Sequence, residues 1–227
     1  MQSREFTDLE DLRLIYRGNK ILNDLFTESI HSIRRLTKDE SNAKAFYRFL
    51  QNDRVSEEDI VSNMQSNCIA ACKGKLVVCI QDTTEINLSS HSKRINRYDA
   101  IGTTNAKSTH GLGFFLHPSL VIDAVNRIPY GYAAIKIWNR SLDFQSKFER
   151  QYNKLPIAQK ESYKWIEVSS NTQAALSETV AGMVIVQDRE GDIYEQFATI
   201  PDAKTDLLIR ARTNRKLVDK TKLFDCL

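Results

Sequence analysis

The sequence lacks any apolar run approaching the ~18 consecutive residues that a membrane-spanning helix needs, so we expect no membrane span. Residues 1–12 mix acidic and basic side chains without an apolar centre, which argues against a secretory signal peptide. Cysteine is scarce, with only Cys68, Cys72, Cys79 and Cys226, as is typical of a protein whose thiols stay reduced. These absences predict a cytoplasmic protein.

Several motifs of catalytic sites are also missing. Cys68 and Cys72 would share a helix face, but no further pair of Cys or His residues stands at zinc-site spacing, so buried thiols are the better interpretation. Neither Gly-x-Ser-x-Gly nor Gly-x-x-x-x-Gly-Lys-Ser/Thr occurs, which disfavours a serine hydrolase and excludes a P-loop ATPase. The histidines are scattered and are interpreted as surface or packing residues: His31, His91, His110 and His117.

The composition is that of an ordinary globular protein, with 41% hydrophobic and 27% charged residues in a chain of 227. Apolar residues recur at helical spacing up to about Lys73, and Gly74 is a standard stop. Short runs rich in Val and Ile follow, so the expected order is helices, then β-β-β-α-β, then a further strand, in an α+β or α/β fold. The predicted segments are strands at 76–80, 111–125 and 128–138, a helix at 160–178, and strands at 183–187 and 206–212.

Two of these strands end alike. Val77–Glu85 reads VVCIQDTTE and Val184–Asp192 reads VIVQDREGD, so an apolar run, a glutamine and an aspartate follow one another twice. The continuous apolar runs predict strands buried on both faces. If the two strands are central and parallel, Asp82 and Asp188 lie at the carboxyl edge of the sheet, where open α/β folds place their chemistry. Two carboxylates at such a short distance from each other favour the binding of a divalent cation between them.

Other interpretations of these aspartates stay open. Either one alone is explained more simply as a cap of a turn or of a helix N-terminus. Phosphatases with an aspartyl nucleophile also place Asp after an apolar strand, often with a second Asp two residues later. That position is Thr84 here, and no glycine-rich segment follows, which disfavours this reaction.

Basic side chains are concentrated in two segments. Residues 209–222 hold six Lys or Arg against one acid, and residues 91–140 hold seven against two, although the formal net charge is only +3. Such segments can follow a nucleic-acid phosphate backbone, and a solvated basic face is the equally good alternative.

Several segments together resemble bacterial insertion-sequence DDE transposases of the Tn-five group. They are IQDTTE, KESYKW (Lys160–Trp165) and VQDREGDIYE (Val186–Glu195). The segment AFYRFLQNDRVSEEDI (Ala45–Ile60) is similar to the N-terminal DNA-binding helices of the same group. The likeness runs in order along nearly the whole chain.

The resemblance implies a division into three parts. A helical DNA end-binding region covers 1–74, a partial RNase H-like catalytic core covers 75–200, and a β-rich insertion starts at 201–227. It also implies that Asp82 and Asp188 are catalytic acids that hold Mg²⁺, with Mn²⁺ as a substitute. They would serve DNA cleavage at the transposon ends and transfer of the freed 3′-hydroxyl into target DNA.

Double-stranded DNA is therefore the implied partner, both as transposon end and as target. Most contacts should position phosphates rather than read bases. The implied contacts are Lys44, Arg48, Arg189, Arg210, Arg212, Arg215 and Lys216. A homodimer of the full-length protein, a nucleoid-associated place in a bacterial cytoplasm and the absence of a membrane partner complete these expectations.

One part of the family pattern is missing. A later signature starts with Tyr-x-x-Arg and supplies a third acid, a Glu, but none of the eight tyrosines has Arg three positions on. Family members are also longer, so the chain resembles a piece that breaks off in the insertion. Asp192 and Glu195 are weak substitutes for the third acid. The alternatives to a transposase are a DNA-binding remnant that competes for transposon ends without catalysis, and an inert remnant.

Overall fold

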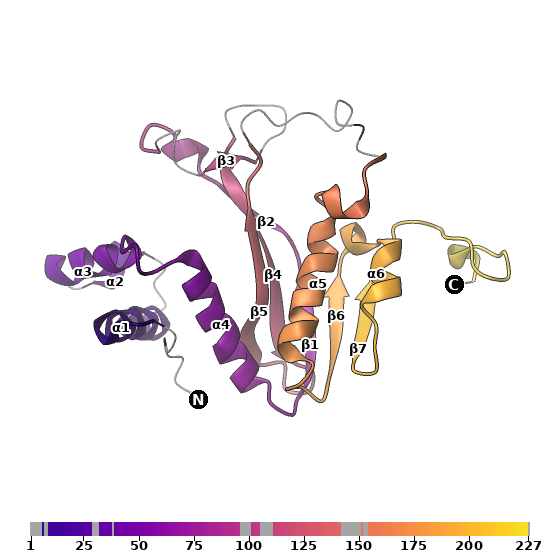
Figure 1. Cartoon of the computed structure of the whole chain (residues 1–227), viewed down its shortest axis with the longest axis horizontal. Helices are drawn as coiled ribbons and strands as arrows, with labels where there is room; N and C mark the ends of the chain where they lie inside the picture. The colour runs from indigo at the N-terminus through magenta and orange to yellow at the C-terminus, as the bar shows by residue number, and fades with distance from the viewer. Residues whose placement is uncertain are drawn as a thin grey trace. The chain divides into compact units, whose positions relative to one another are not determined.

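The computed structural model describes residues 6, 9–28, 32–37, 39–95, 101–104, 111–141, 151 and 154–226. The chain divides into two compact units, Met1–Ala71 and Cys72–Leu227 (Figure 1). The first is helical and the second contains a mixed β-sheet, which confirms the predicted mixture of α and β structure with the helices first. No helix in these described ranges is both long and apolar enough to cross a membrane. His31 and His110 lie outside the described residues.

The first unit is a set of helices around an apolar core. The helices are α1 (Leu12–Glu28), α2 (Ile33–Leu36), α3 (Glu40–Leu50) and α4 (Glu57–Ala71). Its buried core residues are Phe6, Leu9, Ile21, Leu36, Phe46 and Phe49. The start of α3 is set by Asp39, whose carboxylate accepts the backbone N–H of Asn42 at 2.7 Å. At the start of α4, Ser56 and Asp59 each accept the other's backbone N–H. These side chains satisfy amides that have no partner within the helix, so both helices begin at defined residues.

The second unit is built on one sheet. Its strands are β1 (Leu76–Gln81), β2 (Thr84–Asn87), β3 (Gly102–Thr103), β4 (Leu112–Asp123), β5 (Pro129–Trp138), β6 (Gly182–Gln187) and β7 (Thr205–Ile209). Its α-helices are α5 (Tyr163–Leu176) and α6 (Tyr194–Thr199). The strand order is β2-β4-β1-β6-β7, with β3 and β5 also paired to β4. β4 and β5, which correspond to the strands predicted at 111–125 and 128–138, form an antiparallel pair, whereas β6 lies parallel to both β1 and β7.

One face of this sheet packs against α5 (Figure 1). Val77 and Cys79 of β1 and Ile185 of β6 are buried on this face. His117 of β4 meets the ring of Trp165 of α5 edge-on, with 4.4 Å between ring centroids. The alternation of buried and exposed positions along β1 and β6 therefore places the core of the unit between the sheet and α5.

The other face of the sheet differs from the prediction. Leu76 and Ile80 of β1 are 55% and 39% exposed, so the prediction that β1 is buried on both faces was wrong. Val186 pairs with Ile80 on one side and with Leu208, which is 61% exposed, on the other. These side chains form an apolar row across three strands. The apolar run in β1 thus reflects a sheet face that is apolar without being fully covered by the described residues.

Candidate functional site

Asp82 and Asp188 follow directly on two neighbouring parallel strands. β1 pairs with β6 in a register that joins Ile80 to Val186, 106 positions later, and Asp188 follows Asp82 by the same interval. Neighbouring strands lie about 4.7–4.9 Å apart, so this register brings both aspartates to the same edge of the sheet, side by side. The expected placement of the two strands next to each other is confirmed, and metal binding stays a prediction.

Both aspartates are exposed, and each has a local partner. Asp82 accepts the backbone N–H of Thr83 at 2.7 Å. Arg210 lies with its Nη1 3.6 Å from Oδ1 of Asp188, and these two side chains are 62% and 58% exposed. The N–H of Arg210 donates to the carbonyl of Gln187 at 3.2 Å, which keeps the residue after β7 beside Asp188. Exposed ion pairs of this kind contribute little to stability, so Arg210 can leave Asp188 for another anion.

The chemistry of this pair suits a hard divalent cation. Carboxylate oxygens are preferred ligands of Mg²⁺ and Mn²⁺, and Mg²⁺ is commonly held by one or two carboxylates together with waters and phosphate oxygens. In the described part of the chain, no group of three or more His, Cys, Asp or Glu side chains is placed to hold a metal ion. The donor set therefore fits an ion that completes its coordination from solvent and substrate.

Asp192 has a structural role in the segment that follows β7. Its carboxylate is 1% exposed and pairs with the guanidinium of Arg215. It also accepts the backbone N–H of Arg212 at 2.7 Å and of Thr213 at 3.0 Å. Burial alone raises the pKa of Asp192, but these donors outweigh it, and the pKa lies below its usual range. Asp192 thus anchors the segment after β7, which disfavours it as a third metal ligand.

The basic residues of the second unit fall into two groups. Arg189 is exposed in the 3₁₀ turn that follows β6, and Arg212 and Lys216 are exposed in the segment after β7. Arg215 is only 29% exposed, and its guanidinium lies 5.6 Å from the ring centroid of Phe197. Among these candidates, Arg215 is therefore the one whose contacts within the chain must be broken before it can contact a ligand.

In the first unit, Lys44 and Arg48 are both exposed on α3. Lys44 makes an exposed ion pair with Glu40 at 3.8 Å. The short helix α2 adds two exposed arginines, Arg34 and Arg35, which were not among the DNA contacts expected from the sequence. The available signal was a pair of adjacent basic residues, which is weak without a helix to place them. The first unit thus presents cations on two of its helices.

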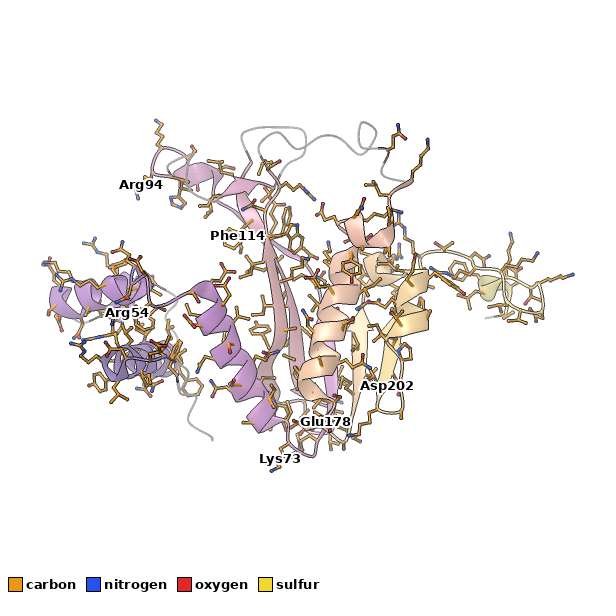
Figure 2. The ribbon with its side chains drawn as sticks, viewed as in Figure 1. Arg54, Lys73, Arg94, Phe114, Glu178 and Asp202 are labelled. Carbon is orange, nitrogen blue, oxygen red and sulfur yellow. The ribbon has the colours of Figure 1, made fainter. Side chains whose placement is uncertain are left out.

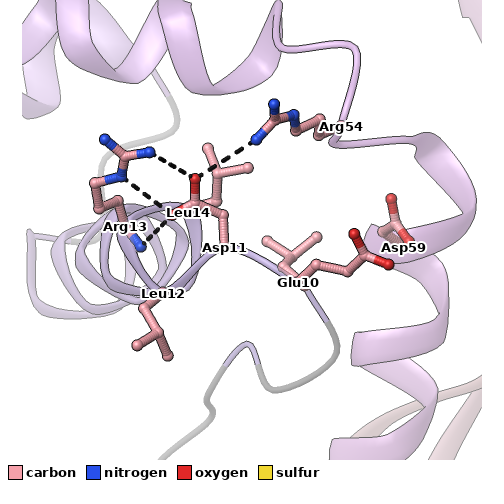
Figure 3. Close-up of a pocket in the computed structure, with 8 residues that line it drawn as sticks. Glu10, Asp11, Leu12, Arg13, Leu14, Arg54 and Asp59 are labelled. Carbon is pink, nitrogen blue, oxygen red and sulfur yellow. Dashed lines mark hydrogen bonds and ion pairs between the residues drawn. The ribbon is translucent and has the colours of Figure 1, made fainter.

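A pocket of the first unit lies where α1 begins (Figure 3). Asp11 at its centre pairs with Arg13 at 3.0 Å and with Arg54 at 3.8 Å. The hydrogen bonds from Arg13 lower the pKa of Asp11 below its usual value. Because these charges satisfy one another, the pocket differs from the exposed cations of α2 and α3.

The glutamine that precedes each aspartate has a structural role that the sequence pattern did not indicate. Gln81 and Gln187 are the last residues of β1 and β6, and they are 2% and 4% exposed. Both reach the hydroxyl of Ser169 on α5: Gln187 donates to its Oγ at 2.9 Å, and that Oγ lies 3.4 Å from Oε1 of Gln81. The signal was present as a glutamine in each apolar strand, but its partners come from helices distant in sequence.

A buried histidine lies next to the site. Nδ1 of His117 is 2.9 Å from Oγ1 of Thr83, the residue that follows the first aspartate. Burial is the main cause that lowers the pKa of His117 to about 3, and the charges of Lys164 and Lys136 lower it further. The imidazole is therefore neutral at physiological pH, and its bond to Thr83 helps to place the end of β1.

We expect the free energy of unfolding to decrease as the pH falls from about 6.5 to about 3, because the unfolded chain protonates His117 within this window and the folded chain does not. Urea unfolding of the whole chain at several pH values measures the slope. His117→Gln removes the titrating group, so the slope between these limits should become shallower. A slope that the substitution leaves unchanged would assign the acid sensitivity to other groups.

Comparison with known proteins gives a match within the first unit and a match that extends over most of the chain. Residues 3–55 match the family model of transposase DNA-binding domains. A solved structure similar to the chain is the cryo-EM structure of the piggyBac transposase synaptic complex with hairpin DNA, with a TM-score of 0.40 and 12% sequence identity. The similarity covers 90% of this chain and 42% of that protein, so the chain spans less than half of its neighbour's length. The first unit is thus similar to domains that bind DNA in transposases.

Proposed function

We propose that the chain is a DDE-type DNA transposase of the bacterial insertion-sequence kind, or a piece of one. It binds transposon ends as double-stranded DNA and serves metal-dependent cleavage and strand transfer. The observation that carries the proposal is the parallel register of β1 and β6, which sets Asp82 beside Asp188. The family match at residues 3–55 supports DNA as the ligand.

An RNase H-like core is part of this proposal. Its support is the strand arrangement: β1, β4 and β5 are antiparallel neighbours, and β6 follows α5 and pairs with β1 in parallel. This is the β-β-β-α-β order that the resemblance implies. The two aspartates then occupy the carboxyl ends of the two parallel strands, which is where such sheets carry their chemistry.

The residues around this edge have separate tasks. Asp82 and Asp188 present the oxygens that would hold Mg²⁺ or Mn²⁺. Such ions would stabilise the attacking and leaving oxygens in phosphodiester cleavage. Arg210 is paired with Asp188 in the structure, and we propose that it moves to a phosphate oxygen when DNA binds. Arg189, exposed in the adjacent turn, is positioned for a second phosphate.

The remaining cations would hold the DNA backbone. In the first unit, Lys44 and Arg48 act with the arginines of α2, and in the second unit Arg212 and Lys216 act from the segment after β7. Arg215 is better assigned to holding that segment, because its guanidinium is already paired with Asp192. Contacts of this kind fix the position of a duplex without reading its sequence.

Two aspartates complete only part of a two-metal site. With the help of DNA phosphate oxygens they would hold one ion weakly, and a second ion would require a third acid. We therefore propose that these 227 residues bind DNA detectably and cleave it poorly, and that cleavage needs a further segment with the third acid. The absence of a three-residue metal cluster from the described ranges favours a second candidate, a DNA-binding protein without catalysis.

The DNA-binding part of the proposal is tested by charge reversal on α3. Arg48→Glu should weaken binding to a random-sequence duplex and lower the slope of log affinity against log salt by about 1, because one phosphate contact is lost. The fold should survive, since the side chain is exposed. The matched control is Arg13→Glu, an exposed arginine of the same unit that already pairs with Asp11.

Fluorescence anisotropy over a range of salt concentrations gives the affinity and the slope. Circular dichroism checks that both variants fold. If Arg48→Glu binds like the unmodified chain, or if both variants lose affinity equally, α3 is not the helix that contacts DNA.

A further inference from the structure

The buried amides beneath the aspartates form a continuous chain of hydrogen bonds. Gln187 donates from Nε2 to Oε1 of Gln81 at 2.8 Å, across the two strands. Gln196 of α6 donates from Nε2 to Oε1 of Gln187 and, at 3.0 Å, to the carbonyl of Gly191. The N–H of Gly191 donates to the carbonyl of Asp188 at 2.9 Å. This chain connects the end of β1, the end of β6 and the turn that carries the second aspartate.

Gly191 is fitted to this network. A methyl group on its Cα would lie 2.2 Å from Oε1 and 3.0 Å from Cβ of Gln187. Gly191 does not have a positive φ, so its backbone conformation suits any residue, and the nearest atoms that oppose a side chain there belong to Gln187. The missing side chain at this position therefore leaves room for the amide.

Helix α5 also holds the same turn, through two of its residues. Ser169 of α5 accepts the amide of Gln187 at 2.9 Å. Lys164, at the start of α5, has its Nζ 3.5 Å from Oε2 of Glu190, in the middle of the turn. The turn after β6 is thus tied to α5 by an internal amide contact and by an ion pair closer to the surface.

We infer that Gln187 and Gln196 are positioning residues, which hold the turn of Asp188 against the end of β1 so that the two aspartates stay side by side. Apolar side chains would fill the same space, but apolar packing is not directional and does not set the distance between the strand ends. A buried amide that loses its partner is penalised, so the network opposes slipping or separation of the strand ends. The inference rests on the proposed function, because the proposed function is what gives the two aspartates a metal ion to bind.

The test uses two variants that disturb the network from opposite sides. Gln187→Met removes the amide and keeps a side chain of similar length. Gly191→Ala keeps every polar group and displaces the amide of Gln187 by contact. The matched control is Gln173→Ala, which removes another amide of the same unit. Gln173 donates to the carbonyl of Ile200 at 3.0 Å and to Asp202, which is labelled in Figure 2.

Hydrogen–deuterium exchange of the metal-free chain and Mn²⁺ titration are the two measurements. Both network variants should exchange the amides of residues 188–191 at least ~10-fold faster and bind Mn²⁺ about 10–100-fold more weakly, the range typical of residues that orient metal ligands. The Gln173→Ala control should leave both quantities unchanged, even if it lowers stability.

Unchanged exchange at residues 188–191 in both variants would overturn the inference, and so would faster exchange with Mn²⁺ affinity equal to that of the unmodified chain. A different result concerns the proposed function. If the unmodified chain binds no Mn²⁺, the metal site fails, and the exchange measurement alone still decides whether the amides hold the turn.

Discussion

Replacing Asp82 or Asp188 by asparagine is expected to abolish Mg²⁺-dependent nicking of transposon-end DNA, with a loss greater than roughly 100-fold, beyond that typical of residues that only orient metal ligands. Asparagine keeps the size and removes the charged oxygen that holds the ion. Both side chains are exposed at strand ends, so the fold should not change. The assay uses the chain extended by a segment that supplies the third acid.

The matched control is Asp206→Asn, an exposed aspartate of β7 next to Val184 in the same sheet. It should keep full activity, because it lies on the strand interior and away from the carboxyl edge. Nicking that survives either substitution at the strand ends would contradict the assignment. Robust cleavage by the 227 residues alone would show that they already contain the third acid.

Trp165→Ala is expected to lower the free energy of unfolding of the second unit by about 3–5 kcal/mol, the range for deleting a large buried aromatic side chain. Trp165 is 1% exposed and packs its ring against His117. The ammonium group of Lys164 lies over the ring of Trp165. Its loss leaves a cavity between α5 and the sheet. Urea unfolding followed by circular dichroism measures the change.

The control for this substitution is Tyr194→Ala, since Tyr194 is an aromatic residue of α6 with 71% exposure. Its removal should change the free energy of unfolding by no more than about 0.5 kcal/mol. Equal losses for the two variants would mean that α5 does not pack on the sheet through Trp165. Such a result would also weaken the support for the Gln187 amide, because α5 supplies one of its partners, Ser169.

Local patterns predicted the elements whose residues carry a strong period or a clear stop. The strands that became β1 and β6, and the change from helices to strands at Gly74, follow from short-range apolar patterns. The side-by-side placement of Asp82 and Asp188 was also expected, since parallel strands that end alike meet at one edge. These features depend on neighbours in sequence or on a general rule of sheet topology.

Features that depend on distant partners were not predicted. The short strands β2 and β3 are defined by pairing with β4 rather than by their own residues. The exposure of Leu76 and Ile80 cannot be read from an apolar run, because the same run suits a covered and an uncovered face. The ion pair of Asp192 with Arg215 joins a residue that precedes β7 in the sequence to one that follows it, and only the fold brings them together.

The central claim is that Asp82 and Asp188 hold one metal centre together. Mn²⁺ titration of the unmodified chain, both single asparagine variants and the double variant tests it most directly, because ligands of one ion act as a unit and their effects are not additive. We predict that each single substitution weakens Mn²⁺ binding nearly as much as the double substitution. Additive losses, or affinities that no substitution changes, would contradict a shared metal centre at the ends of β1 and β6.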